Sequence, residues 1–319
     1  MKATYKASIS AVCAAGLVLT ACGVDDDDDF PSSQIEIIVP WAAGGGTDMA
    51  TRQLANAAED TCGVGMTITN QTGAAGATGH QAMAEAGADG YTIGAATVEL
   101  SILQHLGAAE VSPDDLHGIL QFQASPAVLS VPADSEFENV EDLITALEDG
   151  ENVSVATNGT GGIWDIAAGG LALENDVTFT ERVPYDGGPE MAQAAMGGEV
   201  EALASTGAEI LSQLESEDLR ALAVMGDERL DILPDTPTLE EEGYEWTASN
   251  WFGLVAPQDV DSERIAALSE CFGEAAESEE FQEFMENQGF PVEIREHEEF
   301  DSYMNEQYSE FEVLVDELY

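Results

Sequence analysis

The chain is almost without positive charge. Its 319 residues include eight lysines and arginines against 63 aspartates and glutamates, which gives a formal net charge of -55 at pH 7. The only lysines are Lys2 and Lys6. Because a protein that binds nucleic acid needs basic side chains to neutralise phosphates, the composition excludes that class.

The acidic residues are spread along the whole chain and are not gathered in one tail. Self-repulsion of this size destabilises a compact state unless salt screens the charges. We interpret the composition as an adaptation to high salt, with an acidic, solvated surface. A protein that binds cations or basic partners is the alternative, but the even spread of the acids favours the salt interpretation.

The first 22 residues have the pattern of an export signal. MKATYK supplies a short positive region, and ASISAVCAAGLVLTAC is an apolar run too short to anchor a protein across a bilayer. Its end, Leu19-Thr20-Ala21-Cys22, resembles a bacterial lipobox and would make Cys22 the lipidated first residue of the mature chain. An ordinary signal peptide with an incidental Cys22 is the alternative. Residues 23–33, with five consecutive aspartates, are interpreted as an acidic tether.

Cysteine is scarce as well. Cys13 lies in the export signal and Cys22 at its end, which leaves Cys62 and Cys271. The spacing of these two does not resemble a zinc site, which needs clustered ligands. Outside the cytoplasm two such cysteines often pair, so a disulfide and two buried free thiols remain as alternatives.

Catalytic and cofactor motifs are missing. GxGxxG, the P-loop, GxSxG and HExxH do not occur. The histidines at positions 80, 105, 117 and 297 form no metal-like cluster in the sequence, and we expect them at the surface or hydrogen-bonded internally. We therefore predict no cofactor, no metal and no catalytic activity, with an unrecognised carboxylate pair as the competing, enzymatic hypothesis.

What the sequence does contain is an alternation of strands and helices along nearly its whole length. Such alternation predicts parallel sheets covered by helices. The predicted strands are 35–39, 66–70, 91–96, 128–131, 153–157, 179–185, 201–205, 220–225 and 251–255. The predicted helices are 47–60, 79–86, 139–147, 163–174, 189–196 and 208–214, and the remainder after the last strand is mostly helical.

Four glycine-rich loops follow predicted strands, at 44–46, 73–76, 159–162 and 187–188. Ligands of open α/β sheets bind beyond the carboxyl ends of the strands. The loops fall into two groups, before residue 80 and after residue 155, which predicts a cleft between two α/β domains. A glycine loop that opens a helix presents bare N–H groups, which suit an anion.

Eight motifs resemble, in order, those of the substrate-binding proteins of tripartite tricarboxylate transporters, the TctC or Bug family. They are IEIIVPWAAGGGTD (35–48), TNQTGAAGATG (69–79), DGYTIG (89–94), VATNGTGG (155–162), VPYDGGPE (183–190), LRALAVMG (219–226), LPDTPTLEEEG (233–243) and WFGLVAP (251–257). The resemblance implies a two-lobed periplasmic-binding-protein type II fold, with a mostly parallel sheet flanked by helices in each lobe and two strand crossovers between them. Lobe 1 would comprise residues 34–124 and 248–319, and lobe 2 residues 125–247.

The resemblance also implies a function. A protein of this family captures a small carboxylate outside the cytoplasm and delivers it to a membrane permease made of a large and a small subunit. We expect a monomer, anchored by lipid to the outer face of the cytoplasmic membrane. A protein that reports its ligand to a receptor kinase is an alternative that the sequence does not separate from transport.

Main-chain N–H groups can hold a carboxylate without any lysine or arginine, and the resemblance implies contacts of this kind. Thr47 and Asp48 have an alternative role as the helix N-cap, and Tyr185 as a core residue. The predicted ligand-binding residues are Ala43, Gly44, Gly45, Thr47, Asp48, Gly73, Ala74, Gly76, Thr157, Asn158, Gly159, Thr160, Tyr185 and Asp186.

Two positions depart from the family pattern. Gln71-Thr72 stands where family members usually carry Arg-Pro, and Asp186 stands where they often carry lysine. Both departures remove positive charge near the expected cleft. The sequence therefore leaves open a tricarboxylate, a mono- or dicarboxylate, or a zwitterion whose ammonium group faces Asp186.

Overall fold

The computed structural model describes residues 30–185 and 187–319. The predicted signal peptide with Cys22, most of the predicted tether, and Asp186 lie outside the described residues. Pro31–Tyr319 form one compact unit. Within the described part of the chain, no helix is long and apolar enough to cross a membrane.

A first group of strands is built around β1 (Ile35–Val39). It pairs in parallel with β2 (Met66–Asn70) on one side and with β3 (Thr92–Thr97) on the other. The helices and short 3-10 turns of this group are α1 (Gly46–Cys62), η2 (Ala74–Gly76), α2 (Ala77–Ala84), η3 (Val98–Ser101) and η4 (Pro113–Asp115), and later segments add β9 (Ser249–Pro257), α7 (Ser262–Ala276), α8 (Glu279–Gln288), β10 (Arg295–Glu296) and α9 (His297–Leu318).

A second group is built around β5 (Ser154–Thr157). It pairs in parallel with β6 (Glu181–Pro184) and β7 (Ala202–Thr206). The remaining elements are α3 (Val140–Glu148), α4 (Ile163–Glu174), α5 (Gly188–Met196), α6 (Gly207–Glu215) and β8 (Leu219–Val224). The predicted cap of α3 is present, because the Asn139 side chain accepts a hydrogen bond from the Asp142 amide.

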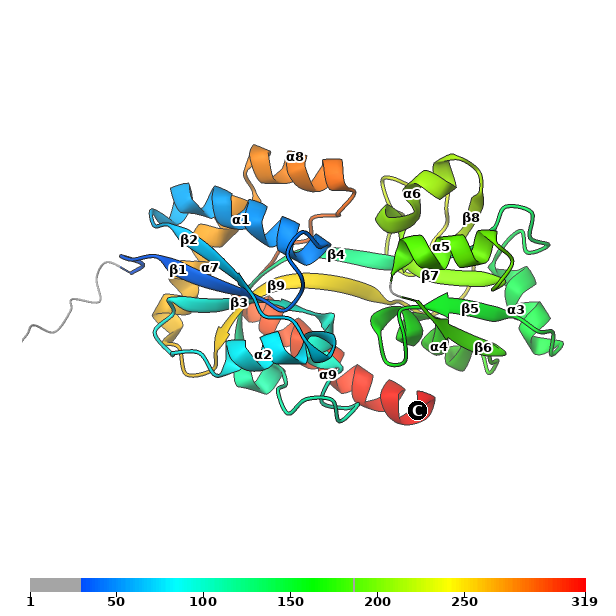
Figure 1. Cartoon of the computed structure of the whole chain (residues 1–319), viewed down its shortest axis with the longest axis horizontal. Coiled ribbons are helices and arrows are strands. Elements are labelled where there is room, and N and C mark those ends of the chain that lie inside the picture. Colours follow the sequence, from blue (N-terminus) through cyan, green and yellow to red (C-terminus); the bar gives the residue numbers. More distant parts are fainter. Residues whose placement is uncertain (1–29, 186) are drawn as a thin grey trace, which may run out of the picture. The chain divides into compact units, whose positions relative to one another are not determined.

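One long strand, β4 (Leu116–Pro132), belongs to both groups. It pairs with β9 from Leu116 to Pro126, and with β7 and β8 from Ala127 to Pro132. In Figure 1 β4 and the yellow β9 run between the blue-to-cyan elements and the green elements. These two strands are the two crossovers of the predicted fold, so the periplasmic-binding-protein type II class is confirmed.

The predicted strand 128–131 covers only the end of β4 and was wrong in its length. Pro126 interrupts the apolar pattern and normally argues against a central strand, because it lacks a backbone N–H. The structure accommodates it where pairing with β9 ends and pairing with β7 has not begun. Two shifts in the register with β9, at Gly118/Leu120 and Gln121/Gln123, further disturb the period-two pattern.

The strand register places the carboxyl ends of the two parallel groups opposite each other. Thr97, at the carboxyl end of β3, is level with Phe252 of β9 and Gln123 of β4. Thr206, at the carboxyl end of β7, is level with Ala127 of β4 and approaches from the opposite direction. Four residues of β4, about 13 Å, separate the two levels. The carboxyl ends of both groups therefore face each other, which is where α/β proteins bind ligands.

A disulfide joins the helices that cover the first group. Cys62, the last residue of α1, is bonded to Cys271 of α7, at a sequence separation of 209 residues. The Thr61 hydroxyl also donates to the Cys271 carbonyl at 2.8 Å. The bond fixes α1, whose first turn carries the glycine loop 44–46, against the C-terminal part of the same group.

Replacing both Cys62 and Cys271 by alanine should lower the free energy of unfolding by about 2–5 kcal/mol, because the bond closes a long loop in the unfolded chain. Urea denaturation in molar salt measures this difference. Reductant should shift the wild-type midpoint to that of the double variant and leave the variant unchanged. A double variant as stable as the oxidised wild type would contradict the prediction.

Candidate functional site

The first glycine loop leads into α1 with bare backbone donors. The N-cap residue is Gly45, which has no side-chain cap, so neither Thr47 nor Asp48 is the N-cap. The first helical hydrogen bond joins the Met49 amide to the Gly45 carbonyl at 2.9 Å. The amides of Gly46, Thr47 and Asp48 have no hydrogen-bond partner among the described residues. Three donors and the positive end of the helix thus adjoin an exposed loop, an arrangement that suits an anion.

Asp48 fixes the conformation of this loop. Its side chain is 2% exposed and accepts hydrogen bonds from the Gly44 amide at 2.8 Å, Arg52 Nε at 2.9 Å and Asn70 Nδ2 at 2.8 Å. Burial alone would raise the pKa of Asp48, but the hydrogen bonds from Arg52, Gly44 and Asn70 outweigh it and lower the pKa. Both carboxylate oxygens are therefore engaged within the protein.

The second glycine loop is strained. Gly73, Ala74, Ala75 and Gly76 all have positive φ, at 138°, 48°, 53° and 90°. For the two alanines this conformation costs about 1–2 kcal/mol each. The amides of Ala74 and Ala75 donate to nothing within the part of the chain that the structure describes. Strain of this kind gathers at ligand sites, and here it turns two N–H groups away from internal partners.

Side chains link the two loops of the first group to each other. The Asn70 side chain, which bonds to Asp48, also donates to the Trp41 carbonyl at 2.9 Å. Trp41 donates from Nε1 to the Thr97 hydroxyl at 3.3 Å, and its ring lies 3.3 Å from where a Cβ on Gly76 would be. The structure thus brings the predicted residues of the first two loops together.

His80 is a fully buried part of the same assembly. One ring nitrogen, Nδ1, lies 3.0 Å from the Gly76 carbonyl, and the other, Nε2, accepts from the Thr97 amide at 3.2 Å. Nδ1 must therefore carry the proton and donate it to Gly76. Burial lowers the pKa of His80 to about 4. The prediction of an internally hydrogen-bonded histidine is confirmed for this residue.

The loop before α4 repeats the construction of the first loop. Asp165 is 2% exposed and accepts from the Gly161 amide at 3.0 Å and from Arg182 Nε at 2.8 Å. Like Asp48, it is the third residue of its helix and follows an extended glycine N-cap, here Gly162. Gly44 and Gly161, which donate to the two aspartates, have φ of +85° and +76°.

Sequence reasoning missed Asp165 and Arg182. A signal was available, since GGGTD (44–48) and GGIWD (161–165) share the pattern Gly-Gly-x-x-Asp. Asp165 lies at the same place in its helix as Asp48, but the guanidinium comes from a different segment. Arg52 follows Asp48 by one helical turn, whereas Arg182 belongs to β6, so its pairing with Asp165 could be found only in the fold.

The predicted residues of the second group hold their own loops. The Thr157 hydroxyl donates to Asp165 at 3.4 Å, and Asn158 Oδ1 accepts from the Trp164 amide at 3.0 Å. The half-buried Tyr185 donates from its hydroxyl to Glu199 at 3.5 Å. Gly159 has a φ of +97° and Thr160 is exposed. None of these contacts tests ligand binding, which stays a prediction for this group.

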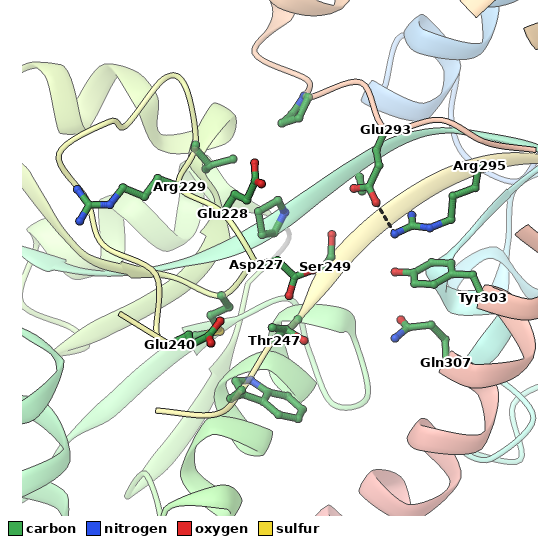
Figure 2. Close-up of a pocket in the computed structure, with 18 of the residues that line it drawn as sticks. Asp227, Glu228, Arg229, Glu240, Thr247, Ser249, Glu293, Arg295, Tyr303 and Gln307 are labelled. Carbon is green, nitrogen blue, oxygen red and sulfur yellow. Dashed lines mark ion pairs between the residues drawn. The ribbon is translucent and has the colours of Figure 1, made fainter. Parts of the chain in front are cut away.

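A cavity of about 1550 Å³ is lined by none of the predicted residues. It lies on the face of β4 that carries Ala124 and Pro126, and Figure 2 shows it with the ion pair of Arg295 and Glu293 at one side. Its acidic lining residues are Glu174, Asp227, Glu228, Asp231, Glu240, Glu245, Glu286, Glu293, Glu306 and Glu310. Such a lining repels a carboxylate, so this cavity does not suit an anionic ligand.

The two arginines nearest the glycine loops are both paired within the protein. Arg52 and Arg182 are engaged by Asp48 and Asp165. No group of three metal-ligating side chains occurs in the described ranges 30–185 and 187–319. The glycine loops present N–H donors, and the buried carboxylates of Asp48 and Asp165 fix the conformation of their backbone.

Comparison with known proteins gives consistent matches. The model of the tripartite tricarboxylate transporter family receptor, TctC, matches residues 50–319. A UPF0065 protein encoded in the gbd 5' region of Cupriavidus necator is 30% identical over 258 residues, or 80% of this chain and 78% of that protein. Protein BugT of Bordetella pertussis is 30% identical over 269 residues, 82% of each chain. A solved TctC solute-binding protein from Polaromonas superposes with a TM-score of 0.84 at 26% identity, covering 91% of this chain and 100% of that one.

Protonation of His80 should destabilise the fold in acid. The unfolded side chain titrates near 6.5 and the buried one near 4, so the unfolded state binds more protons between these values. The contribution of His80 to stability is therefore complete above pH 6.5 and falls by about 3 kcal/mol as the pH drops to 4. Denaturation of wild type and His80→Gln at several pH values in molar salt measures it. The difference in the free energy of unfolding between wild type and variant should shrink below pH 6.5. A difference that stays constant with pH would refute the assignment.

Proposed function

This chain belongs to the family of tripartite tricarboxylate transporter receptors, and we propose that it is the extracytoplasmic solute-binding component of such a transporter. It captures a small carboxylate between the two glycine-loop edges and delivers it to a membrane permease with a large and a small subunit. Binding without catalysis is part of the proposal, because the loops offer hydrogen-bond donors and no nucleophile–base pair.

One observation carries the proposal. Within ranges 30–185 and 187–319, the amides of Gly46, Thr47 and Asp48 have no hydrogen-bond partner, and they lie next to an exposed loop whose shape Asp48 fixes. A carboxylate there would accept several N–H bonds and lie at the positive end of a helix dipole. The amides of Ala74 and Ala75, which have no partner among the described residues, belong to the neighbouring glycine loop and would extend the same set of donors.

The two lobes of the proposal have the boundaries inferred from the sequence, with residues 34–124 and 248–319 in one and 125–247 in the other. β4 and β9 then form the hinge. A ligand favours closure only through contacts that it makes in the closed state, so donors from both lobes have to reach it. Gly159 and Thr160, in the loop before α4, are the proposed contacts from the second lobe, together with Tyr185 and Asp186.

Attachment to the membrane is proposed from the sequence alone. The lipobox-like end of the leader makes Cys22 the lipid-bearing residue, and the acidic residues 23–33 form the tether that lets the binding domain reach the permease. The protein would act as a monomer on the outer face of the cytoplasmic membrane. High external salt would screen the self-repulsion of its acidic surface.

A thermal-shift screen of the chain from Gly23 onward, in molar salt, tests the proposed function. Mono-, di- and tricarboxylates should include at least one that raises the melting temperature by several degrees. At a hundred times the dissociation constant the stabilisation is about 2.7 kcal/mol. Neutral sugars of similar size serve as the negative set. A cooperative melt that no carboxylate shifts would refute the proposal.

Gly44→Ala should weaken binding of the carboxylate identified in that screen at least tenfold, because a methyl group would project into the open space beside the donors. Gly150→Ala is the matched control, since Gly150 also has a positive φ (74°) and open space around its Cβ position, but lies after α3. Both changes should cost about 1 kcal/mol of stability. Calorimetry that finds equal affinities for the two variants would contradict the assignment of the first loop.

A further inference from the structure

Two buried polar side chains lie on β4 between the two glycine-loop edges. Gln123 is 1% exposed and Ser125 is 4% exposed. Gln123 is level with Thr97 at the carboxyl end of β3, and Ser125 lies two residues before Ala127, which is level with the carboxyl end of β7. The two side chains therefore lie where the ligand of the proposed function would be enclosed.

The register places the side chain of Gln123 on the sheet face that carries Phe252, the face on which Phe290 approaches the start of α1. The neighbour of Gln123 on β9 is Phe252, whose ring centroid is 6.3 Å from that of Phe290, and Phe290 in turn lies 3.1 Å from the Cβ position of Gly46. The large acidic cavity reaches Phe290 as well, but on β4 it is lined by Ala124 and Pro126 and by neither Gln123 nor Ser125, so these two side chains lie on the other face of the strand.

Gln123 is fixed at one end and unpaired at the other. Its Nε2 donates to the Ser125 hydroxyl, whereas its Oε1 has no hydrogen-bond partner among the described residues. Native proteins rarely leave a buried amide oxygen unpaired. The register shift between Gln121 and Gln123 is a further sign of function, because such bulges re-aim side chains next to binding sites.

A second acceptor lies at the same edge. Glu99 lies in η3, two residues after the end of β3, and its carboxylate accepts a hydrogen bond from the hydroxyl of Thr97, the residue level with Gln123. Burial raises the pKa of Glu99, and the bond from Thr97 offsets part of that rise. The carboxyl ends of the first group of strands therefore carry both N–H donors, in the glycine loops, and acceptors, in the side chains of Gln123 and Glu99.

We propose that Gln123 is a specificity-determining residue whose amide oxygen accepts a hydrogen bond from a hydroxyl or ammonium group of the bound carboxylate. Ser125 holds the amide in place. The inference rests on the proposed function, since it assumes that a carboxylate occupies the donors of the first loop. It assigns the ligand to the hydroxy- or amino-carboxylates and disfavours the unsubstituted acids.

Isothermal titration in molar salt with succinate, malate and aspartate tests the inference, because these acids share a four-carbon skeleton and differ in one substituent. Glutarate, 2-hydroxyglutarate and glutamate form a second set for a longer site. Wild type should bind one substituted acid at least tenfold more tightly than its unsubstituted parent, since a site with a buried polar group discriminates against a ligand that leaves it unpaired. Gln123→Leu should abolish this preference and change the affinity for the parent acid less than threefold.

Gln121→Leu is the matched control. Gln121 is also fully buried, and its amide has no hydrogen-bond partner in the described part of the chain, but its β9 neighbour is Gly253, whose Cβ position abuts Phe300 of α9. Adjacent residues of β9 point to opposite faces, so Gln121 lies away from the glycine loops. This variant should keep the wild-type preference, and a loss equal to that of Gln123→Leu would overturn the inference.

Gln123→Glu separates the two kinds of substituent and guards against misfolding of the leucine variant. It keeps an acceptor at the same place and adds negative charge, so the amino acid should gain on the hydroxy acid at least threefold relative to wild type. Equal wild-type affinities for the three acids of a set would overturn the role of Gln123 and leave the proposed function standing. Failure of wild type to bind any carboxylate would overturn both.

Discussion

A buried carboxylate that accepts a backbone N–H is the interaction on which each glycine loop depends. Asp48 holds the Gly44 amide and Asp165 holds the Gly161 amide, four residues before each aspartate. Glycine loops have no side chains to hold them and lose much entropy on ordering. The aspartate therefore supplies the order that the loop lacks. At α1 the amides of Gly46, Thr47 and Asp48 keep no partner among the described residues, whereas at α4 the Trp164 amide donates to Asn158 and the Asp165 amide to Gly162. Loss of either carboxylate would release the loop and the donors beside it together.

The same interaction bears on how so acidic a protein could hold the anion of the proposed function. Arg52 and Arg182 form ion pairs with Asp48 and Asp165, the aspartates that fix the loops. In the proposed binding mode these cations stabilise the loops and do not contact the ligand. Replacing surface lysines by acids removes no main-chain N–H donor, so donors of this kind persist in a chain with very few cations. The departures at Gln71-Thr72 are compatible with this mode, because Asn70 beside them already ties the second strand to Asp48 and Trp41.

The sequence predicted what depends on local pattern and could not predict what depends on long-range pairing. Strands such as Ile35–Val39 and the glycine loops after them follow from period, turn residues and strand ends. β4 was recognised only at its end, because Pro126 and two bulges hide a strand that two sheets share. Gln123 was missed for the same reason: alone it is one polar residue among many, and only its register with Phe252 and Thr97 gives it a place in the site.

The second glycine-loop edge differs from the first in one respect that bears on motion. Its aspartate also binds the Tyr319 hydroxyl, and burial together with Asp165 raises the pKa of Tyr319, so that the hydroxyl keeps its proton and donates it. The tyrosine follows α9, whose Phe300 packs against Trp251 of β9 with ring centroids 5.3 Å apart. The loop before α4 is thus stabilised partly by a residue at the end of α9, a helix that packs against β9 of the first group. The printed contacts of Asp48, which stabilises the loop before α1, all come from the first group itself. If β4 and β9 form the proposed hinge, a movement of the second group of strands relative to α9 would strain the hydrogen bond between Tyr319 and Asp165 and so disturb the loop before α4.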